Sequence, residues 1–136
     1  ARVGRLLRMS DELESVSDEA AAILKATRRI RKDGQMFSAH SRGILMDVHG
    51  MVAAFAADVS ARLKSPRPRF DLAPVRSRAH EIGEAIRRGR RGQLDRVGPD
   101  DPASPIRVLA ELDILNAYER IRSCYLNIAE TLADGK

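Results

Sequence analysis

The chain has 136 residues, a formal net charge of +5 and a single cysteine. That length suits one domain with a modest core that needs no cross-links. Because Cys124 is alone, an intrachain disulfide is excluded and a reducing compartment is expected. There is no uninterrupted run of about eighteen apolar residues, so we expect no membrane span within the chain. The start at Ala1, with neither an initiator methionine nor a signal peptide, suggests a fragment or a trimmed start.

The positive charge is concentrated in one stretch. Residues 62–96 contain eleven Lys or Arg against four Asp or Glu, so the rest of the chain is slightly acidic. A basic stretch of this kind can meet nucleic acid, anionic lipid headgroups or an acidic partner, and composition alone does not choose between them.

A first helix is predicted over residues 3–31. Its apolar positions recur at alternating three- and four-residue steps, which places them on one face. They are Leu6, Met9, Leu13, Val16, Ala20, Ile23, Thr27 and Ile30. Basic residues crowd its last turns, where cations complement the helix dipole, and Gly34 is expected to end it in a left-handed cap.

A second helix is expected to start between residues 35 and 38 and to run to Lys64. Gly43 and Gly50 lie inside it, and glycine in a helix interior costs about 1 kcal/mol relative to alanine. We interpret both glycines as points where another helix approaches closely. The prolines of segment 65–69 then predict a loop.

A third helix is expected from about Asp71, whose carboxylate can cap it, with Pro74 in the first turn. Its inward face is predicted to hold Val75, Ala79, Ile82 and Ile86. Beyond Ile86 two glycines interrupt an arginine-rich run, so we expect the helix to fray there. The proline-rich segment 98–105 predicts a second loop.

A fourth helix is predicted to begin with Ser104 as N-cap and Pro105 in the first helical position. Six apolar positions on one of its faces are Ile114, Tyr118, Ile121, Tyr125, Ile128 and Leu132. No segment alternates with period two. The sequence therefore predicts an all-α fold, an antiparallel helical bundle of four helices.

The first and fourth helices look like copies of one pattern. A constant shift of 105 residues lays Met9, Leu13, Val16, Ala20, Ile23 and Thr27 over the six apolar positions of the fourth helix. The same shift aligns Glu14 with Glu119, and Asp18 with Ser123. A shared glutamate in register with the apolar stripe indicates an internal repeat.

The segment YERIRSCYLNIAE resembles the signature helix of PhoU-like phosphate-uptake regulators. The residues that carry the resemblance are Tyr118, Glu119, Arg120, Ile121, Asn127, Ile128, Ala129 and Glu130, and LESVSDEAAAI resembles a more degenerate first copy. The resemblance implies that residues 1–34 form a helix from the end of a first, truncated repeat. Residues 35–136 would be a PhoU-like three-helix unit.

The degenerate motifs and the long basic third helix look most like the cytoplasmic C-terminal region of the bacterial sodium–phosphate cotransporter family. The resemblance implies a non-catalytic regulatory domain in phosphate transport and homeostasis, cytoplasmic and tethered to the membrane portion of the same polypeptide. A free-standing phosphate-uptake regulator, acting on another transporter or a sensor kinase, is the alternative within the fold. A basic nucleic-acid-binding helical protein is the alternative from another class.

The resemblance also implies a metal site, with a divalent or iron-type ion held by Glu14, Asp18 and Glu119. Carboxylates four residues apart on a helix can share one cation. The second copy departs from the pattern at Ser123, because a hydroxyl adds no charge. We therefore favour a solvated acidic face at Glu14 and Asp18, with Asp11, Glu12 and Glu19 as neighbours, and expect no cofactor.

The sequence contains no catalytic pattern. The sequence has neither a glycine-rich phosphate loop nor a nucleophile elbow, and His40, His49 and His80 lack the four-residue spacing of a helical metal pair. We interpret these histidines as surface or boundary residues, and Tyr118 and Tyr125 as core residues. An enzyme is not expected.

Two partner predictions remain. The apolar stripe of a helix from a truncated repeat needs cover, so we expect a homodimer with the first helix in the interface. The basic patch from Arg87 to Arg96 is predicted to face either solvent or an anionic membrane surface. No aromatic residues interleave its arginines, and nucleic-acid binding is not expected.

Overall fold

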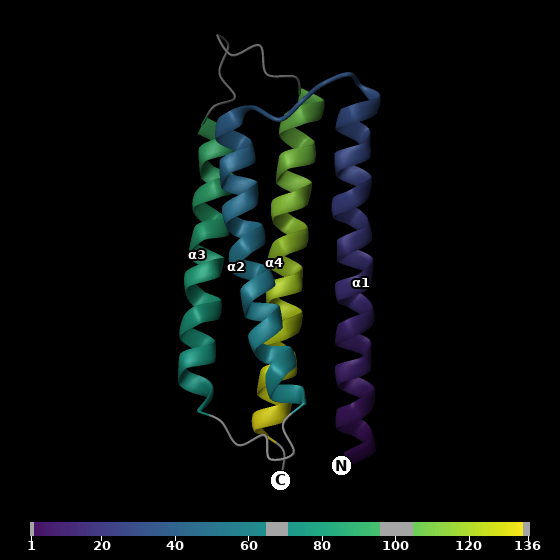
Figure 1. Cartoon of the computed structure of the whole chain (residues 1–136), viewed down its shortest axis with the longest axis vertical. Helices are drawn as coiled ribbons and strands as arrows, with labels where there is room; N and C mark the ends of the chain where they lie inside the picture. The colour runs from purple at the N-terminus through teal and green to yellow at the C-terminus, as the bar shows by residue number, and fades with distance from the viewer. Residues whose placement is uncertain (1, 65–70, 96–104, 135–136) are drawn as a thin grey trace.

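The computed structural model describes residues 2–64, 71–95 and 105–134, and these residues contain four α-helices and no strand. The helices are α1 (Arg2–Lys32), α2 (Ala39–Leu63), α3 (Leu72–Asp95) and α4 (Pro105–Ala133). Helices that follow each other in the chain run in opposite directions (Figure 1). The predicted all-α, four-helix antiparallel bundle is thereby confirmed.

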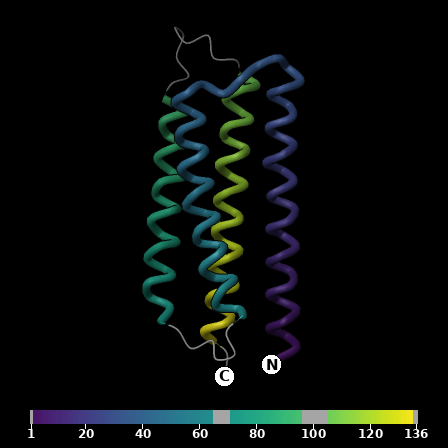
Figure 2. Tube along the Cα trace, in the orientation of Figure 1, coloured from purple at the N-terminus to yellow at the C-terminus, as the bar shows by residue number. Residues whose placement is uncertain are grey.

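Helix α4 is the centre of the arrangement. It packs against each of the other three helices, and α2 and α3 also pack against each other. Helix α1 packs against α4 alone and lies to one side of the other three (Figure 1; the chain path is followed in Figure 2). The described helices therefore form a mutually packed set of three with a fourth helix on the outer side of α4.

Local sequence signals set the described helix ends. Gly34 has φ 68°, and the Gly34 and Gln35 backbone N–H groups donate to the Arg31 and Ile30 carbonyls at 3.0 and 3.1 Å. The Ser38 hydroxyl accepts from the Ser41 N–H at 3.1 Å at the start of α2. At α3, Asp71 Oδ1 accepts from the Ala73 N–H at 3.0 Å. The predicted caps at Gly34 and Asp71 are confirmed, and α2 begins at Ala39, one residue after the predicted range of 35–38; Ser104 and most of the two predicted loops lie outside the described residues.

Helix α3 continues past the point where fraying was predicted. Gly89 lies so close to α2 that a Cβ there would be 3.1 Å from Ile44 Cγ2. One turn later the buried Gln93 donates from Nε2 to Ser41 Oγ at 3.0 Å. The prediction was wrong because these tertiary contacts offset the intrinsic cost of glycine. A side chain at 89 would have to displace Ile44 by a few tenths of an ångström, so the close approach favours glycine there.

The glycines of α2 behave in the opposite way. A Cβ added at Gly43 or Gly50 would meet nothing within 4 Å, and both residues are exposed. The prediction of close helix approach at these two positions was wrong for this bundle. The face of α2 that carries them points to solvent.

The core lies between α2, α3 and α4. The predicted inward face of α3 is buried, as are Val48, Phe55 and Val59 of α2. On α4, Ile114, Ile121 and Ile128 are buried, and the alternate positions Tyr118, Tyr125 and Leu132 are half-buried. The predicted apolar face of α4 is confirmed.

The predicted face of α1 was partly wrong. Leu6 and Leu13 are 59% and 43% exposed, and Ala20 is also exposed. The positions turned toward α4 are buried or half-buried and recur at alternating three- and four-residue steps: Met9, Glu12, Val16, Glu19, Ile23, Ala26 and Ile30. The contact face is thus rotated from the purely apolar stripe toward a stripe that contains two glutamates.

Helix α2 is the one described helix that is long and apolar enough to cross a membrane by length and composition. A core helix of a soluble bundle satisfies the same criterion. In this bundle only 28% of its most apolar window is buried, so much apolar surface of α2 remains open.

Phe55→Ala should destabilise the bundle by about 3–5 kcal/mol, because Phe55 is 1% exposed and its removal leaves a cavity among three helices. Urea unfolding followed by circular dichroism measures the change. Met46→Ala is the matched control on the same helix, because Met46 is 61% exposed and its truncation should change stability by less than about 0.5 kcal/mol. Equal effects of the two substitutions would contradict this packing.

Candidate functional site

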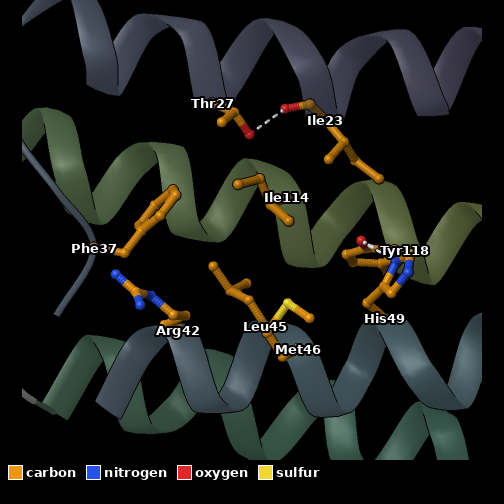
Figure 3. A pocket seen from close by; sticks show the side chains of 9 residues that line it. All are labelled: Ile23, Thr27, Phe37, Arg42, Leu45, Met46, His49, Ile114 and Tyr118. Carbon is orange, nitrogen blue, oxygen red and sulfur yellow. Dashed lines mark hydrogen bonds between the residues drawn. The ribbon is translucent and has the colours of Figure 1, made fainter. Parts of the chain in front are cut away.

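An open apolar groove runs between α1 and α2, with α4 as its floor. It exists because α1 contacts α4 and leaves α2 untouched. Two adjoining hollows of about 250 and 400 Å³ share Ile23, His49 and Tyr118, which makes the groove continuous. The first is also lined by Thr27, Phe37, Arg42, Leu45, Met46 and Ile114 (Figure 3), and the second by Val16, Ala20, Leu24, Val52, Ala53, Ala56, Ile121 and Tyr125.

The polar centre of the groove is a histidine–tyrosine pair. His49 Nδ1 lies 2.9 Å from Tyr118 Oη, and the rings meet edge to face with centroids 5.8 Å apart (Figure 3). Burial raises the pKa of the Tyr118 hydroxyl. The hydroxyl therefore keeps its proton and can take part in the hydrogen bond with the imidazole nitrogen. The pair gives a mainly apolar surface, which Arg42 and Thr27 also line, a fixed polar point near its middle, as ligand and peptide grooves commonly have.

Histidine and tyrosine come together here from residues 69 positions apart in sequence. The sequence interpretation of Tyr118 as a core residue is half right, since one side of the ring packs inward and the hydroxyl reaches the groove. His49 is exposed, as expected for a surface or boundary residue, and His40 and His80 are exposed too.

The seam between α1 and α4 contains polar contacts among its apolar ones. Arg120 Nε donates to Glu19 Oε1 at 2.6 Å, and Asn127 Nδ2 donates to Glu12 Oε1 at 3.2 Å. The Glu19 side chain is only 18% exposed. The interpretation of these two acids as part of a solvated face was therefore wrong. Their partners lie more than a hundred residues away, which no local pattern reveals.

The structure does not gather the three predicted metal ligands into one cluster. Glu14 and Asp18 are exposed on α1. Glu119 is half-buried and accepts hydrogen bonds from Arg122, which also donates to the Ala79 carbonyl of α3 at 3.3 Å. Among the described residues no three His, Cys, Asp or Glu side chains form a group that could hold a metal ion. Metal binding by Glu14, Asp18 and Glu119 stays a prediction.

A second surface lies at the end of the bundle where α1 and α3 finish and α2 and α4 begin (Figure 1). Arg28, Arg31 and Lys32 of α1 are exposed there, as are Arg88 and Arg91 of α3. We call this surface the basic end. In the sequence, the basic residues of α1 and those of α3 form two separate runs. Only the antiparallel packing brings the ends of these two helices to the same end of the bundle.

Other arginines near the basic end are held by neighbours. Arg87 pairs with Glu84, and its guanidinium lowers the pKa of that carboxyl. Arg90 Nη1 donates to Asn116 Oδ1 of α4 at 2.9 Å. Within the predicted patch, Arg88 and Arg91 are therefore the side chains best placed to meet a partner, and Arg96 lies outside the described residues.

Comparison of the chain with protein-family models, with curated proteins and with solved structures finds no match in any of the three. The resemblance to PhoU-like proteins therefore depends on the residues quoted for it alone.

Cys124 should react slowly with thiol reagents. It is 8% exposed, and burial, together with the hydrogen bond and charge of Glu12, raises the pKa of its thiol to about 11. Since only the thiolate reacts, the folded chain at pH 8 should be modified about 100-fold or more slowly than the chain unfolded in guanidinium. Ellman's reagent measures both rates. Glu12→Gln should speed the reaction and Glu14→Gln should not. Equal rates in the folded and unfolded chains would contradict the burial of Cys124 between α1 and α4.

Proposed function

We propose that this chain is a non-catalytic, PhoU-like regulatory domain of a sodium–phosphate cotransporter family protein, acting in phosphate transport and homeostasis. The observation that supports the proposal most is that the two helices with the repeated pattern, α1 and α4, pack directly against each other. Glu19 and Cys124 are related by the 105-residue shift, and both lie in the α1–α4 seam. So do the buried residues Ala26 and Thr131. When two copies of one helix pack against each other about an approximate two-fold axis, equivalent positions of both copies lie in the contact between them.

The domain would act through surfaces and carry out no chemistry. The groove offers apolar side chains of a neighbouring helix a place to dock, with the His49–Tyr118 pair as a fixed polar contact. The transporter portion of the same polypeptide is the partner that the resemblance implies. A change in how that partner occupies the groove would relay a signal to the transport unit.

The basic end would face the anionic inner surface of the membrane. Exposed Lys and Arg next to such a surface contribute about 1 kcal/mol each. The first and last described residues lie at the other end of the bundle (Figure 1).

A blocked groove should alter transport. Ala53 lines the groove and is exposed, so Ala53→Trp should fill part of it without disturbing the core. In cells that express the full-length protein, uptake of radiolabelled phosphate should change several-fold in its response to external phosphate. Ala54→Trp is the matched control, because Ala54 is exposed and is not among the groove-lining residues. The same uptake response in wild type and both variants would contradict the proposal.

The basic end should bind vesicles that contain phosphatidylserine, and salt should weaken the binding. Arg88→Glu with Arg91→Glu should lower the partition coefficient at least about tenfold, because two attractive charges become repulsive. Arg2→Glu with Arg8→Glu makes the same charge change on exposed residues at the other end of the bundle and should have a small effect. Vesicle sedimentation measures the partition. Salt-dependent binding to duplex DNA without binding to vesicles would instead favour the nucleic-acid alternative.

A further inference from the structure

The outer face of α1 has a stripe of charged residues that is acidic at one end and basic at the other, so two antiparallel copies of it have complementary charges. Seven residues at alternating three- and four-residue steps form it: Asp11, Glu14, Asp18, Ala21, Lys25, Arg28 and Lys32. All seven are exposed, and by helix periodicity they lie opposite the positions that face α4. Three acids, one alanine and three bases follow one another in that order. We call this set the charged stripe.

An isolated helix gains little from this order. Neighbours on the stripe have like charges at a spacing of four, as in Glu14 with Asp18 and Arg28 with Lys32, and such pairs repel. The helix dipole favours the bases in the last turn, Lys32 among them, but it favours acids only in the first turn, and the first turn of α1 has no acid. Asp11, Glu14 and Asp18 are all further along the helix. The order therefore calls for a complementary surface outside α1.

No described helix supplies that surface. Helix α1 packs against α4 alone, through its opposite face. The basic half of the stripe instead borders a hollow of about 450 Å³ whose lining residues, Ala21 among them, all belong to α1. The stripe is open along its length.

We propose that a second copy of this chain covers the charged stripe, with the two α1 helices antiparallel about a two-fold axis at Ala21. In this register Asp11 lies opposite Lys32 of the other copy and Asp18 lies opposite Lys25. Glu14 lies opposite Arg28. Because a two-fold interface repeats each contact, the three pairs become six. This pairing is independent of the proposed function, since it uses the stripe and leaves out the groove and the phosphate-regulator resemblance.

The small residue at the centre of the stripe suits a close helix contact. Ala21 is exposed, and its methyl group lets two helix backbones approach more closely than a larger side chain would. Leu24, which is 59% exposed and lies beside the stripe, would be partly covered by the partner. Burial of Leu24 adds an apolar contribution to an interface that would otherwise depend on charge.

Other registers are disfavoured by the same charges. A parallel pair would place each residue beside its own copy, so that acids meet acids and bases meet bases. An antiparallel pair shifted by seven residues would centre on Asp18 or on Lys25 and place two like charges on the axis. Complementary charge selects one register by penalising the others.

Charge exchange within one chain tests the register. Sedimentation equilibrium at low salt should give a dimer that dissociates as salt is raised, because exposed charges are screened. Asp18→Lys should weaken dimerisation at least tenfold, and so should Lys25→Asp, since each places two like-charged pairs across the interface. The double variant with both changes restores opposite charges in every pair, so its dimerisation constant should return to within about threefold of wild type. Asp47→Lys, an exposed acid on α2, is the matched control and should dimerise normally.

A cross-link tests the axis. In a Cys124→Ala background, Ala21→Cys places two thiols across the two-fold axis, and mild oxidation should give a disulfide-linked dimer. Ala54→Cys, on the exposed face of α2, should stay monomeric on a denaturing gel. Circular dichroism confirms that each variant is folded. A wild-type monomer at low salt, a dimer indifferent to Asp18→Lys, a double variant that is not rescued, or cross-linking at Ala54 as efficient as at Ala21 would each overturn the proposal.

Discussion

The rest of the structure depends on the two different faces of α4. One face is apolar, and its isoleucines are buried against α2 and α3. The other face meets α1 through small and polar side chains, among them Ala117, Cys124 and Asn127, and two of its partners on α1 are glutamates. Because both faces of α4 are occupied, it contacts three helices while α1 contacts one. Because α1 contacts only α4, the groove between α1 and α2 and the charged stripe on the outer face of α1 are both left open.

The sequence predicts most of the fold because the relevant signals are local. Gly34, Ser38 and Asp71 set helix ends through hydrogen bonds to residues a few positions away, and the apolar spacing of α4 is visible in any window of twenty residues. The same reasoning fails where tertiary contacts decide. Helix α3 extends to Asp95 because Gly89 fits against Ile44 and Gln93 bonds Ser41, and neither contact is visible in the α3 segment itself.

The orientation of α1 could not be predicted for a physical reason. Two stripes compete on this helix, one purely apolar through Leu13 and Ala20 and one that contains Glu12 and Glu19. Hydropathy favours the first. The second is the one that packs against α4, because Arg120 and Asn127 provide partners for the carboxylates and make their partial burial tolerable. The groove was invisible for a related reason, since His49 and Tyr118 meet only after three helices are placed.

Helix α1 therefore has three surfaces with different surroundings. The glutamate-containing face is satisfied by α4, the apolar flank with Ala20 and Leu24 lines the groove, and the charged stripe points away from the bundle. The groove flank lies about 100° from each of the other two surfaces, which is the step between successive residues of a helix, and the glutamate-containing face and the charged stripe lie on opposite sides of α1. A second copy on the stripe would cover part of Leu24 and leave His49, Ala53 and the floor of the groove accessible. Pairing of two copies and docking of a partner in the groove are therefore compatible, and a ligand that reached Leu24 from the groove side would couple the two.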